Sequence, residues 1–183
     1  MKKGYLFLAD GCEEIEALTP VDILRRAGIE VKTVSISDRT EVTGSHGIGI
    51  RADALFADQD FSDADYLILP GGMPGTKHLG AHEGLCALLR EAARKEIWIC
   101  AICAAPSVLG DMGLLKGRKA TCYPGLEPRL TGAETLQEEV VRSGNFITSR
   151  GMGTAIPFAL EIVSVLGSSE QAEELGKSVV YRV

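Results

Sequence analysis

Apolar runs of strand length alternate with segments of helical periodicity along the whole chain, and this alternation constrains the fold more than any other feature. Tyr5–Ala9, Tyr66–Leu69 and Ile97–Ile102 are continuously apolar, as strands buried on both faces require. Apolar residues recur at three- and four-residue steps over 13–27, which predicts a helix that ends at Gly28. Because parallel strands are joined through helices, the sequence predicts an α/β domain with a mostly parallel sheet.

The remaining segments continue the same alternation. Residues 40–57 hold three glycines and predict a short hairpin or ribbon. We expect strands at 31–36 and 118–122, a strand pair formed by 140–141 and 146–148, and helices at 79–95, at 104–109, from an N-cap at Thr154 to about Leu166, and at 169–176. Pro20 lies inside the first helix, where its missing N–H predicts a kink or a looser turn.

Length and composition restrict the class of protein. The 183 residues are material for a single domain over 1–183. Twenty-five acidic against nineteen basic residues give a net charge of −6, which argues against nucleic-acid binding. No window approaches the ~18 apolar residues of a membrane span, and the first apolar run stops at Asp10, too early for a signal peptide. The five cysteines are an odd number without dense spacing, which predicts free thiols and a cytoplasmic protein.

Cys103 stands between a buried strand and a helix, with small residues around it in Ala101-Ile102-Cys103-Ala104-Ala105. A sharp strand-to-helix turn that presents a nucleophile needs such small neighbours. The free N–H groups at the start of the helix favour the thiolate, so this cysteine is a candidate nucleophile. The alternative interpretation is a buried core cysteine, which is a common fate of a free thiol.

A glycine pair ends the neighbouring strand. Gly71 and Gly72 can turn backbone N–H groups toward an oxygen anion, whereas a tight turn alone would also explain them. Together with the cysteine at another strand end, the pair predicts a nucleophile beside an oxyanion hole.

Glu16 is the candidate acid or base. Glu13 and Glu16 share a helix face while Glu14 points elsewhere, although such a cluster is most often a solvated face. A carboxyl group facing the cysteine turn would have its pKa raised by burial and by the nearby thiolate. It could then donate a hydrogen bond to sulfur or, when ionised, accept a proton.

Several other chemistries find no support. Cys100 and Cys103 form a C-x-x-C, but Cys100 lies within the strand run, and no second pair exists for zinc. All three histidines precede Cys103, so the downstream histidine of a glutamine amidotransferase is missing, and Ala104 stands where a related Cys-His peptidase carries histidine. No P-loop or G-x-G-x-x-G follows a strand. We therefore expect no metal and no cofactor.

Five stretches, in order and at compatible spacings, resemble the DJ-1/ThiJ/PfpI superfamily on its DJ-1-like branch. The resemblance runs nearly end to end. The stretches are Gly11–Glu16, Pro20–Asp22 with Arg25–Gly28, Leu69–Gly72, Ala101–Pro106 and Thr148–Gly151.

This resemblance implies a flavodoxin-like three-layer α/β/α sandwich that forms a homodimer. It also implies that Cys103 is an oxidisable nucleophile with Glu16 as its carboxyl partner. Gly72 and Ala104 would supply the oxyanion-binding N–H groups, and Gly71 would shape the turn. Members of the superfamily are described as cofactor-independent glyoxalases that convert methylglyoxal to lactate, as protein deglycases, as oxidative-stress sensors or as chaperones.

One position departs from the family pattern. Several members carry histidine before a proline near the cysteine, and Tyr123 takes that place here. A tyrosine can hydrogen-bond a carbonyl substrate, but with a reference pKa of about 10 it is a poor base near neutral pH. Glu16 would therefore carry most of the proton transfer.

Three functions follow from these residues. The first is an enzyme in which Cys103 attacks a small aldehyde, with no nucleic-acid or membrane partner. The second is a redox-sensing, stress-protective protein whose Cys103 is oxidised to the sulfinate. The third is a non-catalytic ligand-binding or interaction module, which would leave the pairing of Glu16 with Cys103 an accident.

Overall fold

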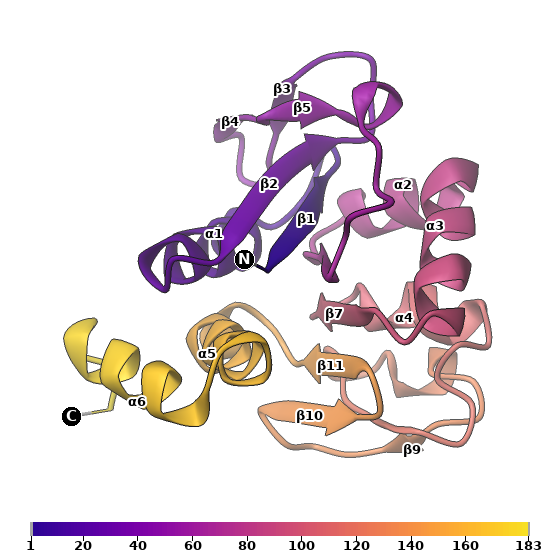
Figure 1. The fold of residues 1–183 in the computed structure, drawn as a ribbon. Coiled ribbons are helices and arrows are strands. Elements are labelled where there is room, and N and C mark those ends of the chain that lie inside the picture. Colours follow the sequence, from indigo (N-terminus) through magenta and orange to yellow (C-terminus); the bar gives the residue numbers. More distant parts are fainter. Residues whose placement is uncertain (1, 183) are drawn as a thin grey trace.

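A seven-stranded sheet runs through the middle of the protein in the computed structural model, which describes residues 2–182 (Figure 1). In spatial order its strands are β10 (Val140–Ser143), β11 (Phe146–Ser149), β7 (Trp98–Ile102), β6 (Tyr66–Leu69), β1 (Lys3–Leu8), β2 (Glu30–Ser35) and β5 (Ala54–Leu55). Every neighbouring pair is parallel except β10 with β11, which form a hairpin. The mostly parallel sheet predicted from the sequence is confirmed.

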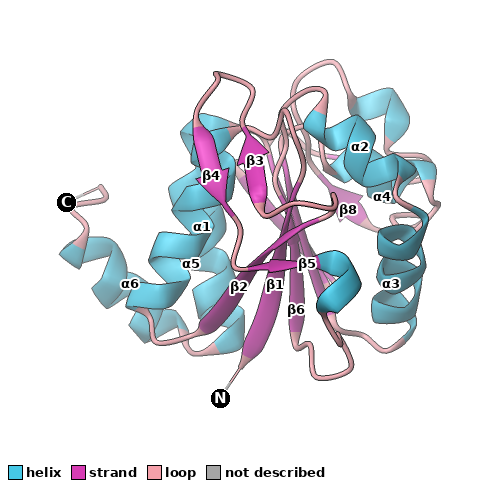
Figure 2. Cartoon of the chain, turned by 90° about the horizontal axis from the view of Figure 1, so that it is seen from above, coloured by secondary structure: helices cyan, strands magenta, loops and turns pink. Residues whose placement is uncertain are grey.

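Helices cover both faces of the sheet (Figure 2). One face carries α1 (Glu14–Arg26), α5 (Ala155–Leu166) and α6 (Ser169–Ser178), and the other carries α2 (Gly75–Ala81), α3 (Glu83–Arg94) and α4 (Pro106–Asp111). Each face has its own apolar core, because alternate residues of every strand point to opposite sides. Leu6 and Ile68 belong to the first core, and Phe7 and Leu67 to the second. The fold is thus the expected flavodoxin-like three-layer α/β/α sandwich.

Short elements lie outside the main sheet. The predicted hairpin within 40–57 is β3 (Glu41–Thr43) paired with β4 (Gly49–Arg51). A second small sheet joins β8 (Lys119–Ala120) to β9 (Glu134–Thr135). Three short 3₁₀ turns are η1 (Phe56–Asp58), η2 (Glu127–Arg129) and η3 (Met152–Thr154).

Two elements differ from the prediction. The helix expected over 79–95 is two helices, because His82 ends α2 and its ring nitrogen accepts a hydrogen bond from the N–H of Leu85, capping α3 at 3.0 Å. The strand expected over 118–122 is only the two-residue β8, outside the main sheet. Beyond β8 the N–H of Thr121 donates to the side-chain hydroxyl of Thr148 in β11, at 3.0 Å, instead of to a backbone carbonyl, so the ladder does not continue.

The N-termini of two helices, α4 and α5, also differ from the prediction, and both lie near the site described below. The helix expected from Ala104 begins at Pro106 instead, because proline suits the first helical position. Cys103 to Ala105 therefore form a turn that lies outside the helix. Thr154 precedes α5 as expected, but its hydroxyl accepts from the N–H of Gly151 at 3.1 Å and does not cap the helix. α1 continues past Pro20 as one helix.

The sheet order places four segment ends together. β1, β6, β7 and β11 are parallel neighbours, so the loops after them meet at one edge of the sheet. The chain passes from β1 to β2, which lies on one side of β1 in the sheet, and later returns to β6, which lies on the other side of β1. Ligands of open α/β sheets bind at such a switch point. Among the described residues, no helix has the length and apolar character to cross a membrane.

Candidate active site

Cys103 occupies a strained turn between β7 and α4. Its φ of 64° lies in the left-handed region, which costs a non-glycine residue roughly 1–2 kcal/mol. The turn is held from two sides: its N–H donates to the carbonyl of Ser149 at 3.0 Å, and its carbonyl accepts from the N–H of Tyr123 at 2.8 Å. The side chain is partly exposed. This backbone strain supports a role for the thiol, because such conformations cluster at functional sites.

Glu16 reaches the thiol from the first turn of α1. The residue is only 1% exposed, and its carboxyl group lies close to Cys103, on the same side of Gly71, where it interacts with the thiol. The N–H of Gly71 donates to Oε2 at 3.0 Å, and the N–H of Met152 donates to the same carboxyl group. Burial raises the pKa of Glu16 to about 7. The expected contact between the two side chains is therefore present, with the carboxyl group poised near neutral pH.

The charge on the thiol differs from the prediction. Burial, and after it the Glu16 carboxylate, raise the pKa of Cys103 to about 12. The N–H groups of Gly72 and Ala104 donate to the sulfur and act in the opposite direction, but they do not outweigh burial. The helix start is weak here, because α4 begins three residues later and has six residues. Above about pH 7 the pair therefore carries one negative charge, on Glu16, while the Cys103 thiol keeps its proton.

Gly71 and Gly72 are required by the space around them. A Cβ on Gly71 would lie 2.5 Å from Glu16 Oε2 and 2.6 Å from the Cβ of Cys103. Gly72 has a φ of 86°, and a Cβ there would lie 2.3 Å from the backbone nitrogen of Glu13. The first glycine lets the carboxyl group approach the thiol. The second turns its N–H toward the sulfur, next to the place where an oxygen on a sulfur-bound carbon would form.

A cavity of about 440 Å³ opens beside the sulfur. Cys103 and Ala104 line it, as does Tyr123 from the segment that follows β8. Most of the remaining lining is apolar and comes from Met73, Pro124 and Leu126. The size and apolar character suit a small carbonyl compound rather than a large charged ligand.

Two contributors were not predicted. Glu13 caps α1, since its carboxylate accepts from the N–H of Glu16 at 2.7 Å, and its charge helps to raise the pKa of Glu16. Met152 contributes only a backbone N–H. The three-residue spacing of Glu13 from Glu16 could have indicated the role of Glu13. The role of Met152 could not be predicted, because a backbone N–H does not depend on the identity of the residue.

Glu14 corrects another expectation. It is 3% exposed and does not lie on a solvated face. Its two carboxylate oxygens accept from the N–H and from Nδ1 of His46, each at 2.8 Å, which ties the β3–β4 hairpin to α1. Glu13, Glu14 and His46 have potential metal-ligand atoms within 4.8 Å of one another, but these hydrogen bonds already engage both oxygens of Glu14.

The other cysteines have different surroundings. Cys12, Cys100 and Cys122 are buried, and Cys86 is partly buried on α3. Cys100 of the C-x-x-C spacing lies within β7 and is fully buried in the apolar core. Cys103 is therefore the one thiol with a carboxyl partner and an adjacent cavity among the described residues.

Comparison with known proteins assigns the family. The model of the DJ-1/PfpI family matches residues 2–165. The chain belongs to the DJ-1/PfpI family. The solved structure of oxidized Toxoplasma gondii DJ-1 superposes with a TM-score of 0.96 and 35% identity, covering 100% of both chains.

Named relatives in the DJ-1/PfpI family include a deglycase. The chain is 31% identical over 166 residues to deglycase TK1284 of Thermococcus kodakarensis, covering 90% of this chain and 99% of that protein. It is 36% identical over 174 residues to DJ-1 homolog B of Arabidopsis thaliana. There the match covers 94% of this chain but spans only 40% of the plant protein.

Proposed function

We propose that this DJ-1/PfpI protein is a cysteine-dependent, cofactor-independent enzyme that acts on 2-oxoaldehydes such as methylglyoxal and on their adducts with amines. The observation that carries the proposal is the close approach of the buried Glu16 carboxyl group to Cys103, in the space that Gly71 leaves by having no side chain. A thiol, a base with a pKa near neutral, and two N–H donors around a small cavity are the parts that carbonyl addition needs. The deglycase among the relatives supports the same class of chemistry.

The first step forms a carbon–sulfur bond. The sulfur of Cys103 attacks the aldehyde carbon while its proton passes to the Glu16 carboxylate. The aldehyde oxygen becomes an oxyanion beside the N–H groups of Gly72 and Ala104, and Glu16 then protonates it to give a hemithioacetal. This route starts from the protonated thiol, so the high pKa of Cys103 is compatible with it.

The second step is an internal oxidation and reduction. Glu16, ionised again, removes the proton from the former aldehyde carbon and returns it to the neighbouring keto carbon through an enediol, while the hydroxyl proton passes from the first oxygen to the former keto oxygen. The first carbon is oxidised to a thioester and the second is reduced to an alcohol, so no outside oxidant is needed. Water then cleaves the thioester to give lactate and the free thiol.

The same first intermediate gives deglycase chemistry. On a methylglyoxal adduct of an amine, the new carbon–sulfur bond replaces the carbon–nitrogen bond, and the amine leaves with the proton from Glu16. The hemithioacetal that remains follows the path above. The cavity beside Cys103 is open enough to admit such an adduct at the end of a flexible side chain.

The direct test is product formation. Purified protein and methylglyoxal should give lactate in a one-to-one ratio with the methylglyoxal consumed, as followed by proton NMR. Consumption without lactate would contradict turnover and indicate only adduct formation on exposed amines and thiols.

A second function, redox sensing, has its own support. The T. gondii relative is described as oxidized, and the position of Tyr123 leaves the site without a histidine base. Oxidation to the sulfinate would consume two peroxide molecules, each giving one oxygen to sulfur and releasing water, and protonated Glu16 would donate to a sulfinate oxygen. Such a sensor would work in the reducing cytoplasm, where the five cysteines would stay thiols.

Mass spectrometry after mild peroxide treatment tests this function. We expect a gain of two oxygens on Cys103 ahead of the other cysteines, because Glu16 and the N–H groups would stabilise the product. Cys86 is the internal control, since it is also partly exposed but has no carboxyl partner. Equal oxidation of all five thiols would remove the redox proposal.

We also propose that two copies associate through α1 and the β3–β4 hairpin. Ile15 and Leu18 of α1 and Ile48 of the hairpin are 48%, 42% and 54% exposed, and the N–H of Ser45 donates to the carbonyl of Cys12, which holds the two segments together. Light scattering should give twice the chain mass for the wild type. Leu18→Glu should shift it to the monomer while Lys116→Glu does not; a monomeric wild type would contradict the proposal.

A further inference from the structure

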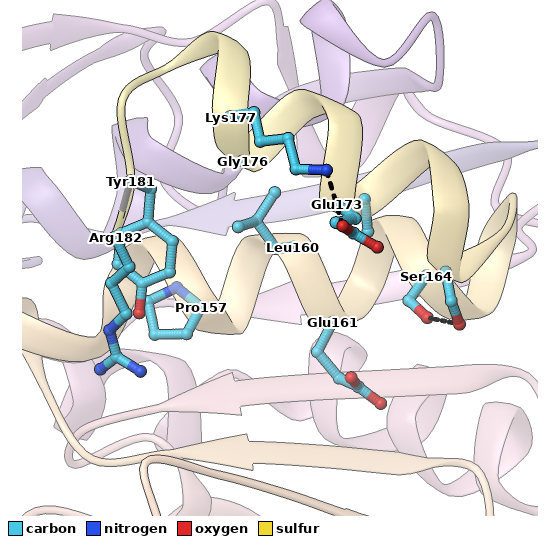
Figure 3. Close-up of a pocket in the computed structure, with 11 residues that line it drawn as sticks. Pro157, Leu160, Glu161, Ser164, Glu173, Gly176, Lys177, Tyr181 and Arg182 are labelled. Atoms are coloured by element: carbon cyan, nitrogen blue, oxygen red, sulfur yellow. Dashed lines mark hydrogen bonds and ion pairs between the residues drawn. The ribbon is translucent and has the colours of Figure 1, made fainter.

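Two cavities away from Cys103 differ in the charges that line them. One, of about 570 Å³, lies between α5 and α6 (Figure 3), and its charged groups are already engaged. The pairs are Lys177 with Glu173, Arg142 with Glu161, and Arg182 with Glu139. A charged ligand would have to displace one of these partners, so this cavity offers no charge of its own.

The second cavity, of about 470 Å³, lies between α2, α3, α4 and η2. Its polar lining residues are Thr76, Lys77, Cys86, Arg90, Asp111 and Arg129. They come from four separate elements that the sheet brings together, and none of them lines the cavity beside Cys103.

The charges in this cavity do not cancel. Arg129 forms an ion pair with Asp111. Within residues 2–182, neither Lys77 nor Arg90 has a carboxylate at ion-pair distance. By contrast, eleven ion pairs in the same part of the chain engage lysines or arginines that lie outside this cavity. The cavity therefore carries two uncompensated positive charges in a chain whose net charge is −6. Two positive charges from different helices suit one dianion.

Thr76 gives a second, independent indication. The residue is 2% exposed, and its hydroxyl has no hydrogen-bond partner among the described residues. A buried hydroxyl without a partner is costly, and each such group calls for an explanation. It lies next to Lys77 in the lining, where an oxygen-rich ligand would supply the missing acceptor.

We propose that the cavity between α2, α3 and α4 binds a small dianion, either a phosphate monoester or a dicarboxylate. Lys77 and Arg90 pair with its two charges, and Thr76 donates its hydroxyl after a change of χ1 rotamer turns it from its buried position to the ligand. Val108 and Met112 form the apolar part of the lining. The site is separate from the proposed reaction at Cys103 and does not depend on it.

Calorimetric titration with inorganic phosphate and with malonate, at low ionic strength and slightly alkaline pH, tests the site in the intact protein. We expect saturable binding of one dianion per chain for at least one probe. Tighter binding of phosphate would identify the phosphate-monoester class, and tighter binding of malonate the dicarboxylate class. Absence of saturable binding for both probes would overturn the proposal.

Substitutions locate the binding. Lys77→Ala and Arg90→Ala should each weaken it by about tenfold, because each removes one charge-assisted contact. Thr76→Val should weaken it less without lowering the melting temperature of the free protein, since it removes an unpaired hydroxyl. Lys116→Ala is the matched control, with an exposed lysine outside the cavity. Equal weakening by Lys77→Ala and Lys116→Ala would contradict the site, whereas Cys103→Ser should bind as the wild type does.

Discussion

Cys103→Ser is expected to lower kcat/KM for lactate formation from methylglyoxal by about a thousandfold or more, the range seen when an essential nucleophile is removed. A serine hydroxyl is a far weaker nucleophile, and it holds its proton too tightly for Glu16 to remove. The substitution changes one atom at a partly exposed position, so the fold should remain. Proton NMR measures the rate of lactate formation, and circular dichroism shows whether the variant keeps its fold.

Cys86→Ser is the matched control for this experiment. Cys86 is also a partly exposed free thiol, but it lies on α3 and has no carboxyl partner. Its substitution should leave kcat/KM within about twofold of the wild type, well under the effect of a lost catalytic contact. A folded Cys103→Ser protein with wild-type activity would refute a covalent mechanism at this residue.

Gly71→Ala should damage stability and activity together. The added Cβ would lie 2.6 Å from the Cβ of Cys103 and 3.0 Å from the carbonyl of Ile102, neither of which can move freely. It would also displace the Glu16 carboxyl group from its 3.0 Å bond with the Gly71 N–H. Overpacking of this kind costs about 3 kcal/mol of unfolding free energy, measurable by urea denaturation. Lactate formation should fall to the level of Cys103→Ser.

Gly153→Ala is the control for the glycine experiment. A Cβ at Gly153 meets no atom within 4 Å, although the residue is in η3 close to the same site. The free energy of unfolding should change by less than about 0.5 kcal/mol, as is usual for surface substitutions. If Gly71→Ala were as stable and active as Gly153→Ala, the close approach of Glu16 to Cys103 would not exist in solution.

The strands and the sheet type follow from simple patterns in this chain. Short, continuously apolar runs such as Tyr66–Leu69, which ends at Pro70-Gly71-Gly72, are typical of strands buried on both faces, and the helices between such strands make the sheet parallel. Boundaries are less predictable, because they depend on single contacts between distant residues. The hydrogen bond from the Leu85 N–H to His82 splits one expected helix into two, and the one from the Thr121 N–H to Thr148 removes most of an expected strand.

The composition of the site was predictable in part. Cys103, Gly71 and Gly72 stand at strand ends, where parallel sheets gather functional groups. The contact of Cys103 with Glu16 was suggested by the resemblance and by the helix face of Glu16. The protonation of the pair was not predictable, since it depends on burial. The sequence predicts a helix start that would lower the pKa of the Cys103 thiol. It does not reveal that the thiol is buried next to the Glu16 carboxylate, and these two effects raise the pKa instead.

The pH dependence of kcat/KM for lactate formation tests the central claim most directly, which is that Glu16 exchanges a proton with Cys103. Below neutral pH the Glu16 carboxyl group is protonated, so it cannot accept the thiol proton of Cys103. Above neutral pH Glu16 is ionised and can accept that proton. From about pH 5 to about pH 9, kcat/KM should rise to a plateau, with its inflection near the Glu16 pKa of about 7. Glu16→Gln should abolish most of the activity at every pH. A flat profile, or an inflection near 7 that persists in an active Glu16→Gln protein, would contradict the account.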